Sequence, residues 1–297
     1  AIYFMTKQLI ITGDDYGLCA SVNQAIEECL FAGTMGATCV MANMAHYADA
    51  AGLRGKFPGR SIGIHWNITQ GAPVLSPTAV PSLVGNDGLF SRELRRRWLA
   101  RQVNRSELRA ELRAQYQRFA AVAGPADFWN THQNSHVFPG LFQLFVDVAI
   151  ELNVPAMRSH RRFTVPKGSG LTRYLFTHPD YWLKGQVIAR WSAAAEARGM
   201  RMPAGRIYLP GHSADLTLLD EIAGRLPWQK IPGPLEWVVH PATSSEDKLL
   251  GGLTESRRHE YELLRQPALA GRLAGLGLRC VGFSELAPEA DAQGRAA

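Results

Sequence analysis

The sequence has 297 residues, of which 46% are hydrophobic and 20% charged, and its formal net charge is +6. This is an ordinary composition for a globular chain, long enough for one large domain or two small ones. No run approaches 18 apolar residues, which argues against a transmembrane helix, and the N-terminus lacks the basic segment and apolar core of a signal peptide.

Strand-like and helical segments alternate along the chain. The predicted strands are Leu9–Thr12, Ala37–Ala42, Ser61–Thr69, Asp127–His132, Ala156–Ser159, Arg206–Leu209, Leu235–His240 and Arg279–Phe283. Helical spacing of apolar residues predicts helices at Val22–Phe31, Ala45–Leu53, Phe142–Leu152 and after an N-cap at Ser106. Residues 70–90 are punctuated by Pro and Gly and are predicted to form a loop near the strand ends. This alternation predicts a mainly parallel sheet in an irregular (β/α) barrel similar to a TIM barrel.

Nothing in the chain suggests a second domain, so we expect a single domain over residues 1–297. Met5 is a candidate natural start, which would make residues 1–5 largely an expression remnant, and residues 288–297 are expected to fray. The four cysteines show no C-x-x-C spacing, so we expect reduced thiols and a cytoplasmic location.

The basic residues concentrate in residues 92–118, where glutamates are interleaved with arginines. This pattern is typical of a solvated helix face, and no basic-aromatic recognition motif accompanies it. We therefore expect no nucleic-acid partner, despite a sequence pI near 9.3.

Two adjacent carboxylates, Asp14 and Asp15, end the first predicted strand. Like charges this close raise a pKa unless a cation or hydrogen-bonding groups neutralise them. One solution is a metal bound by one carboxylate while the other serves as a general base. The alternative, equally favoured by the pair alone, is helix capping at the strand-to-helix turn.

Histidines follow at the ends of later predicted strands, where parallel barrels place their chemistry. His65 lies on an otherwise apolar strand, His132 and His136 are four residues apart, and His240 precedes Pro241. Joined to the Asp pair, they favour a site of one carboxylate and two imidazoles for a divalent ion such as zinc. Each has an alternative structural role, as a hydrogen-bonded core or turn residue; the remaining histidines, including His160, are interpreted as surface or loop residues.

Five segments of the sequence resemble the YdjC-like carbohydrate deacetylases, a family that includes chitooligosaccharide and hopanoid-biosynthesis-associated deacetylases. The segments that carry the resemblance are GDDYGLCASVNQAI (13–26), MANM (41–44), GIHWNITQGAPV (63–74), THQNSHVFPGLF (131–142) and VVHPA (238–242). The resemblance implies an irregular (β/α) barrel that removes acetyl groups from N-acetylated amino sugars with one divalent metal, zinc or magnesium.

The resemblance also implies a role for each matching residue. Asp15, His65 and His132 would be the metal ligands, Asp14 the general base and His240 the general acid. His136 would line the site or support a ligand. The chain departs from the family pattern at Asn134, where a further histidine is common, and at Asn130, where an aspartate often stands.

A more distant resemblance, to NodB-type polysaccharide deacetylases, would instead make His136 a metal ligand in place of His65. Trp66 and Arg158 are candidate sugar contacts, although core packing is an equal expectation for Trp66. Another metal-dependent hydrolase and a non-catalytic sugar-binding module are the competing functions. A homodimer is the default expectation for an enzyme of this size.

Overall fold

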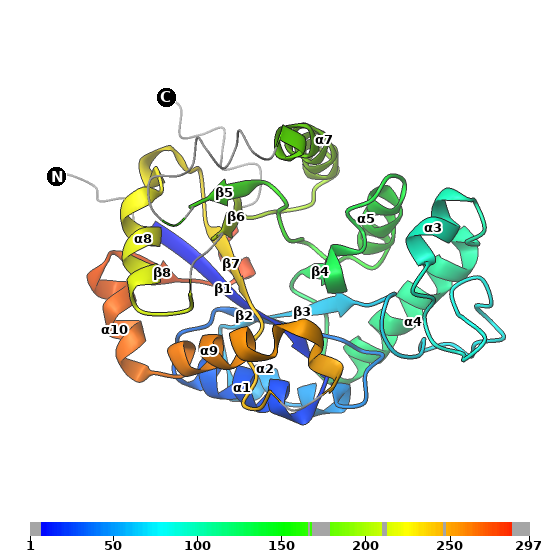
Figure 1. The fold of residues 1–297 in the computed structure, drawn as a ribbon, viewed down its shortest axis with the longest axis horizontal. Coiled ribbons are helices and arrows are strands. Elements are labelled where there is room, and N and C mark those ends of the chain that lie inside the picture. Colours follow the sequence, from blue (N-terminus) through cyan, green and yellow to red (C-terminus); the bar gives the residue numbers. More distant parts are fainter. Residues whose placement is uncertain (1–6, 166, 168–178, 210–212, 246–247, 287–297) are drawn as a thin grey trace.

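The computed structural model describes residues 7–165, 167, 179–209, 213–245 and 248–286. The expectations for residues 1–5 and 288–297 concern parts of the chain outside this description. Within the described residues, every pairing between named strands is parallel, and the strands form one curled sheet in the order β4-β3-β2-β1-β7-β6-β5. The remaining strand, β8, pairs with the beginning of β1 (Figure 1).

The first strand, with ten residues, is the longest of the described strands. Their bounds are β1 Lys7–Tyr16, β2 Ala37–Val40, β3 Ser61–Trp66, β4 Trp129–Thr131, β5 Arg162–Thr164, β6 Gly205–Tyr208, β7 Leu235–Val239 and β8 Leu278–Cys280. The expected irregular (β/α) barrel is confirmed as a half-barrel: the end strands β4 and β5 do not pair with each other.

Helices cover the outside of the curled sheet. They are α1 Ala20–Phe31, α2 Leu53–Lys56, α3 Leu94–Leu99, α4 Arg105–Ala123, α5 Leu141–Glu151, α7 Pro179–Glu196, α8 Thr217–Arg225, α9 Thr254–Leu264 and α10 Pro267–Gly275. Helix α1 packs on β1 and α9, while α4 packs on β3 and α5 (Figure 1). No helix among the described residues combines the length and apolarity that crossing a membrane requires.

Three local predictions were wrong. Residues 156–159 make only isolated bridges, Ala156 with Arg201 and Met157 with Trp129, and the strand in this part of the chain is β5. Residues 45–53 form a 3₁₀ turn and the start of α2 rather than one helix. Helix α4 is capped by Asn104, whose side-chain oxygen accepts from two backbone N–H groups, and not by Ser106.

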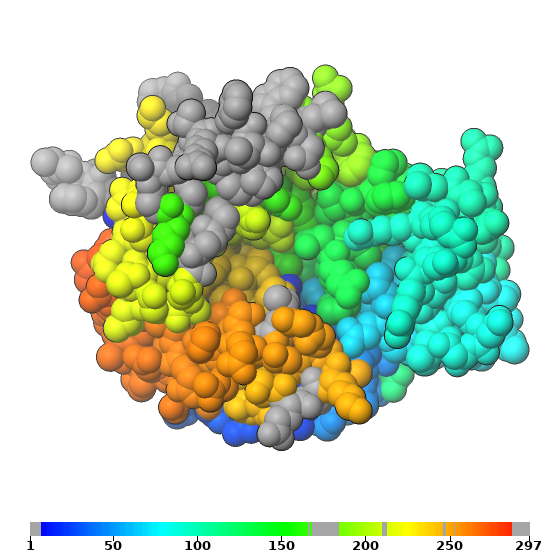
Figure 2. All heavy atoms as spheres, in the orientation of Figure 1, coloured from blue at the N-terminus to red at the C-terminus, as the bar shows by residue number. Residues whose placement is uncertain are grey.

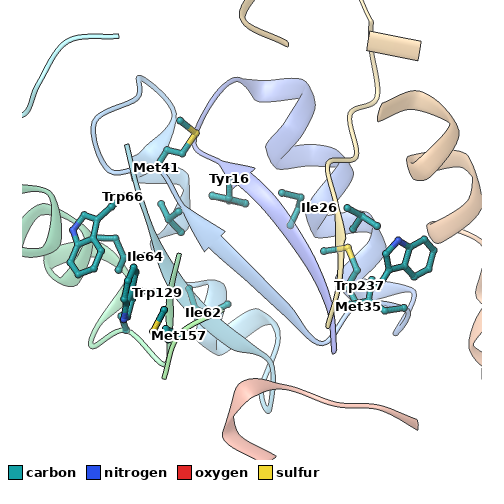
Figure 3. Close-up of a cluster of buried hydrophobic side chains, with 14 of the residues drawn as sticks. Tyr16, Ile26, Met35, Met41, Ile62, Ile64, Trp66, Trp129, Met157 and Trp237 are labelled. Atoms are coloured by element: carbon teal, nitrogen blue, oxygen red, sulfur yellow. The ribbon is translucent and has the colours of Figure 1, made fainter. Parts of the chain in front are cut away.

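The core lies between the sheet and these helices, and it includes aromatic side chains from adjacent strands. Trp66 and Trp129 pack together with ring centroids 5.3 Å apart, and both are fully buried. Figure 3 shows both rings at one side of the hydrophobic cluster, with Ile64 of β3 close to them. Trp66 packs into the core from one face of β3, so the preceding residue, His65, points to the opposite face.

Candidate active site

Asp14 and Asp15 both enter one site because β1 is irregular at its carboxyl end. Successive residues of a regular strand point to opposite faces. Here the register with β2 shifts between Gly13 and Tyr16, and Asp15 adopts φ 70°, a left-handed conformation that is uncommon for a residue other than glycine. Such an irregularity re-aims a side chain, and strained backbone of this kind concentrates at functional sites.

Asp15, His65 and His132 converge on one point, with 1%, 1% and 8% of their surface exposed. One oxygen of Asp15, Oδ1, lies 3.1 Å from His65 Nε2 and 3.0 Å from His132 Nδ1. These three ligand atoms all lie within 4.8 Å of one another, a grouping that could hold a metal ion.

In each histidine, the ring nitrogen that points away from Asp15 has a hydrogen-bond partner, and this partner indicates whether the nitrogen facing Asp15 carries a proton. A neutral imidazole carries one N–H. In a neutral His65 the N–H belongs on Nδ1, which faces the side-chain oxygen of Asn130; in a neutral His132 it belongs on Nε2, which faces Gln70 Oε1 at 2.9 Å. The nitrogens turned toward Asp15 therefore present lone pairs to a carboxylate oxygen. Three lone-pair donors at this distance repel one another unless a cation lies among them, so the donor set fits a divalent metal.

Without a metal, protonation of the imidazoles is the other way to remove the repulsion between their lone pairs and the Asp15 carboxylate. Burial lowers the pKa of His65, but the nearby charges of Asp14 and Asp15 more than offset it, so that pKa lies above its ordinary value. Burial raises the pKa of Asp15, yet the hydrogen bonds that His132 and His65 donate in the metal-free chain, where a proton takes the place of the cation, hold that pKa well below its usual range. The site is thus built around an ionised Asp15 and attracts positive charge.

Asp14 is held by a different set of groups. Arg158 donates from Nη1 to Asp14 Oδ2 and from Nη2 to Asp14 Oδ1, both at 2.7 Å, and its Nε donates to Glu236 Oε1 at 3.0 Å. All three residues are at most 2% exposed. Burial raises the pKa of Asp14, but the Arg158 guanidinium outweighs that effect and keeps it well below its usual range. Asn130 completes the cluster by donating to Asp14 Oδ1 at 3.2 Å.

His240 lies on the other side of Asp14, directly after β7. Its Nε2 is 3.8 Å from Asp14 Oδ2, and about a third of its side chain is exposed. Burial lowers its pKa, against the opposing pull of Asp15 and Asp14. Its backbone N–H donates to Glu260 Oε2 at 2.6 Å, which ties the end of β7 to α9. The imidazole is therefore free to exchange a proton with a bound molecule.

These groups line a cavity of about 410 Å³, a volume suited to a small-molecule ligand. Figure 2 shows this face hollowed between the green segment that contains residues 131–134 and the yellow-to-orange segment around residues 249–257. The residues lining the cavity include Asp14, Asp15, His65, His132, His240 and three arginines, Arg158, Arg206 and Arg257.

Of the two expectations for Trp66, a sugar contact or a core residue, its burial agrees with the core. It is fully buried, its Nε1 donates to Leu112 O at 2.9 Å, and its ring packs on Trp129 and Phe145. The residues that line the cavity do not include it. Arg158 does line the cavity, but all three of its guanidinium nitrogens donate to carboxylates of Asp14 and Glu236, so its place is beside the proposed base rather than on a sugar.

His136 lies apart from the proposed ligands. It is fully buried, its Nδ1 is 2.6 Å from Thr131 Oγ1, and its ring contacts Trp129, Phe142 and Phe145. His160, interpreted as a surface or loop residue, is only 4% exposed and packs edge-on against His136 with centroids 4.7 Å apart. Burial lowers the pKa of both histidines, to about 3 for His136, which favours the neutral form of each.

Cys39 offers a second grouping with Asp14 and His65, because its Sγ lies 3.2 Å from Asp14 Oδ1 and 3.3 Å from His65 Nδ1. Burial and the Asp14 charge raise the pKa of this thiol well above its ordinary value. Metals bind the thiolate rather than the thiol. This grouping therefore fits a metal less well than the one centred on Asp15.

The sequence reasoning missed Glu236, Arg257 and Glu260. The sequence could have singled out Glu236, because it is the one charged residue in the apolar strand LEWVV and a buried charge needs a partner. Arg257 and Glu260 lie in the polar helix α9, where nothing distinguishes them from their charged neighbours. Arg257 donates from Nη2 to Asp15 Oδ2 at 2.6 Å, opposite the oxygen that faces the two histidines.

Comparison with known proteins agrees with this architecture. A solved structure from Enterococcus faecalis V583, described as a candidate for cellobiose-phosphate cleavage, superposes with a TM-score of 0.68 at 22% identity, covering 95% of this chain and 99% of that one. A chitooligosaccharide deacetylase of Yersinia pestis (strain Pestoides F) is 33% identical over 281 residues, which is 94% of this chain and 99% of the relative. One from Yersinia enterocolitica is 28% identical over 288 residues, covering 95% of this chain and 100% of that relative. The model of the YdjC-like protein family matches residues 8–275, and the chain therefore belongs to that family.

Proposed function

We propose that this protein is a metal-dependent carbohydrate deacetylase that hydrolyses the N-acetyl group of an amino sugar. The observation that carries the proposal is the convergence of Asp15 Oδ1, His65 Nε2 and His132 Nδ1, whose lone pairs call for a shared cation. Membership of the YdjC-like family and relatives named chitooligosaccharide deacetylase supply the reaction class.

Asp15, His65 and His132 would hold the metal. Two imidazoles and one carboxylate suit zinc better than magnesium, which ordinarily takes more oxygen ligands. When bound, a divalent cation there would polarise the acetyl carbonyl and lower the pKa of the attacking water.

Asp14 is the proposed general base. It is ionised, lies beside Asp15 and has both oxygens fixed by Arg158, which orients it but also makes it a weak proton acceptor. It therefore depends on a water that is already acidified. His240, 3.8 Å from Asp14, is the proposed donor of a proton to the departing amine nitrogen, and its partial exposure places it where a bound sugar can reach it.

Two competing functions make different demands on the site. A NodB-type arrangement would need His136 as a ligand, but the three ligand atoms that lie within 4.8 Å of one another belong to Asp15, His65 and His132 and not to His136. A non-catalytic sugar-binding module would have no need for a buried Asp14–Arg158 pair beside three metal-ligand atoms, because buried charges are costly to maintain.

The experiment is a metal-replete assay of acetate release from N-acetylglucosamine and its oligomers. Phosphate release from model phosphoesters is measured in parallel for another hydrolase activity. We expect acetate release that EDTA abolishes and zinc restores, together with about one metal ion per chain by mass spectrometry. Acetate release that persists after complete metal removal would contradict metal dependence, and phosphate release without acetate release would contradict the reaction class.

We also propose that the chain forms one domain and acts in the cytoplasm on an N-acetylated sugar, without a nucleic-acid partner, and that it pairs as a homodimer. The single continuous sheet supports the first statement. Light scattering tests the dimer, and a monomer at micromolar concentration would contradict it.

A further inference from the structure

Arg257 is buried against the proposed metal site with two donor nitrogens unused. It lies in α9, is 3% exposed and lines the cavity. Its Nη2 donates to Asp15 Oδ2, whereas its Nε and Nη1 are buried atoms without a hydrogen-bond partner. A buried donor left unpaired is costly, most of all on a charged group, so negative charge bound at the cavity wall beside Arg257 would be favoured.

The charges around the cavity indicate what kind of ligand this is. The carboxylates of Asp14 and Asp15 are already engaged by Arg158 and Arg257, respectively. Arg206, a third cation on the wall, donates to the neutral amide oxygen of Asn134 at 3.3 Å. Burial and the charge of Arg158 lower the pKa of Arg206 to about 10, which an anion nearby would relieve. A charged N–H also binds an anionic oxygen more strongly than a neutral one.

We propose that Arg257 binds the negatively charged oxygen of the acyl group, first as it develops in the reaction and then in the acetate product. This rests on the proposed function, in which water adds to the acetyl carbon, the C–N bond breaks and the amine nitrogen gains a proton. The acetyl oxygen then carries the negative charge, close to Asp15 and therefore close to Arg257. The arginine thus acts as a catalytic residue supplied by α9, a helix outside the sheet.

A purely structural role makes a different prediction. By holding Oδ2, Arg257 also turns Oδ1 of Asp15 toward His65 and His132. If that were its whole role, replacing Arg257 would weaken metal binding alone. Acetate affinity at equal metal occupancy separates the two roles, because positioning of Asp15 does not act on acetate directly once the metal is bound.

The test is calorimetric titration of sodium acetate into the zinc-loaded full chain, with zinc content measured in every sample. The variants are Arg257→Gln and, as a milder change that keeps the charge, Arg257→Lys. Arg265→Gln is the matched control, since Arg265 directly follows the last residue of α9 but is exposed and pairs with Glu262. We expect the acetate Kd to rise at least about tenfold in Arg257→Gln, to rise less in Arg257→Lys, and to stay unchanged in the control.

Unchanged acetate affinity in either Arg257 variant at full zinc occupancy would overturn the inference. If Arg257→Gln does not fold, Arg257→Lys decides the matter, and the inhibition constant of acetate in the activity assay provides a second reading. Acetate binding is measured without turnover, so the role of Arg257 and the deacetylase activity are tested separately. Acetate binding that depends on Arg257, without any deacetylation, would support the role of Arg257 in binding an anion and contradict the proposed function.

Discussion

Arg158 offers the sharpest separation between a substrate contact and a group that holds the proposed base. Replacing it with Met leaves the carboxyl groups of Asp14 and Glu236 buried, at 2% and 0% exposure, without the guanidinium between them. Removing one partner of a buried ion pair typically costs about 3–5 kcal/mol, so Arg158→Met should be strongly destabilised in urea. The double variant Arg158→Met/Glu236→Gln removes one of the two stranded charges and should recover part of that loss.

The kinetic consequence follows from the pKa of Asp14. Arg158 holds that pKa well below its usual range, so Arg158→Lys, whose single ammonium cannot reproduce three nitrogens spanning two carboxylates, should let it rise. We expect kcat to fall about tenfold or more, because Lys cannot fix both oxygens of Asp14, while KM changes little. The raised pKa should move the acid limb of the pH–rate profile to higher pH. Acetate release from an N-acetylated oligosaccharide, measured between pH 4 and 9, provides both readings. Raised KM with unchanged kcat and an unchanged acid limb would refute this reasoning and restore Arg158 as a sugar contact.

Three further predictions concern neighbouring groups. Asp14→Asn should keep its zinc content by mass spectrometry but lose about 10²–10⁴-fold in kcat, and wild-type turnover would contradict the base assignment. Trp66→Phe loses the hydrogen bond to Leu112 O, so its free energy of unfolding in urea should fall by about 1–3 kcal/mol with KM unchanged; a raised KM at unchanged stability would show a sugar contact instead. Burial raises the pKa of Glu260 from 4.5 to about 7, so the metal-free folded chain holds this proton more tightly than the unfolded chain and loses stability as pH rises between these values. That interval corresponds to at most about 3 kcal/mol, and Glu260→Gln should lack this part of the pH dependence in urea unfolding; identical pH profiles would contradict it.

The proposed ligands could be found from the sequence because parallel strands end at a common edge. Asp15, His65 and His132 are far apart in the chain, but each lies at the carboxyl end of β1, β3 or β4, and the sheet order places β1 to β4 side by side. Strand-end position therefore predicted that these side chains meet, whereas the choice of His65 rather than His136 as a ligand came from the family resemblance. His240 lies at the same edge because β7 pairs with β1 on the other side.

Trp66 shows where strand geometry could have corrected the expectation. It follows His65 directly in a regular strand, so the two side chains must point to opposite faces. Once His65 is assigned to the site, Trp66 belongs to the core, where the structure places it. The same rule would have misled at Asp14 and Asp15, because their shared direction depends on a register shift and a left-handed residue that nothing in an Asp-Asp pair reveals.

Adjacent carboxylates repel each other, and the structure shows how both remain ionised. Arg158 engages both oxygens of Asp14, whereas Arg257 engages only Oδ2 of Asp15 and leaves Oδ1 to the two histidines. Both oxygens of Asp14 therefore already face a cation, whereas Oδ1 of Asp15 faces two imidazole nitrogens. The proposed division between base and ligand thus follows from which carboxylate oxygens the two arginines occupy, rather than from the order of the two residues along β1.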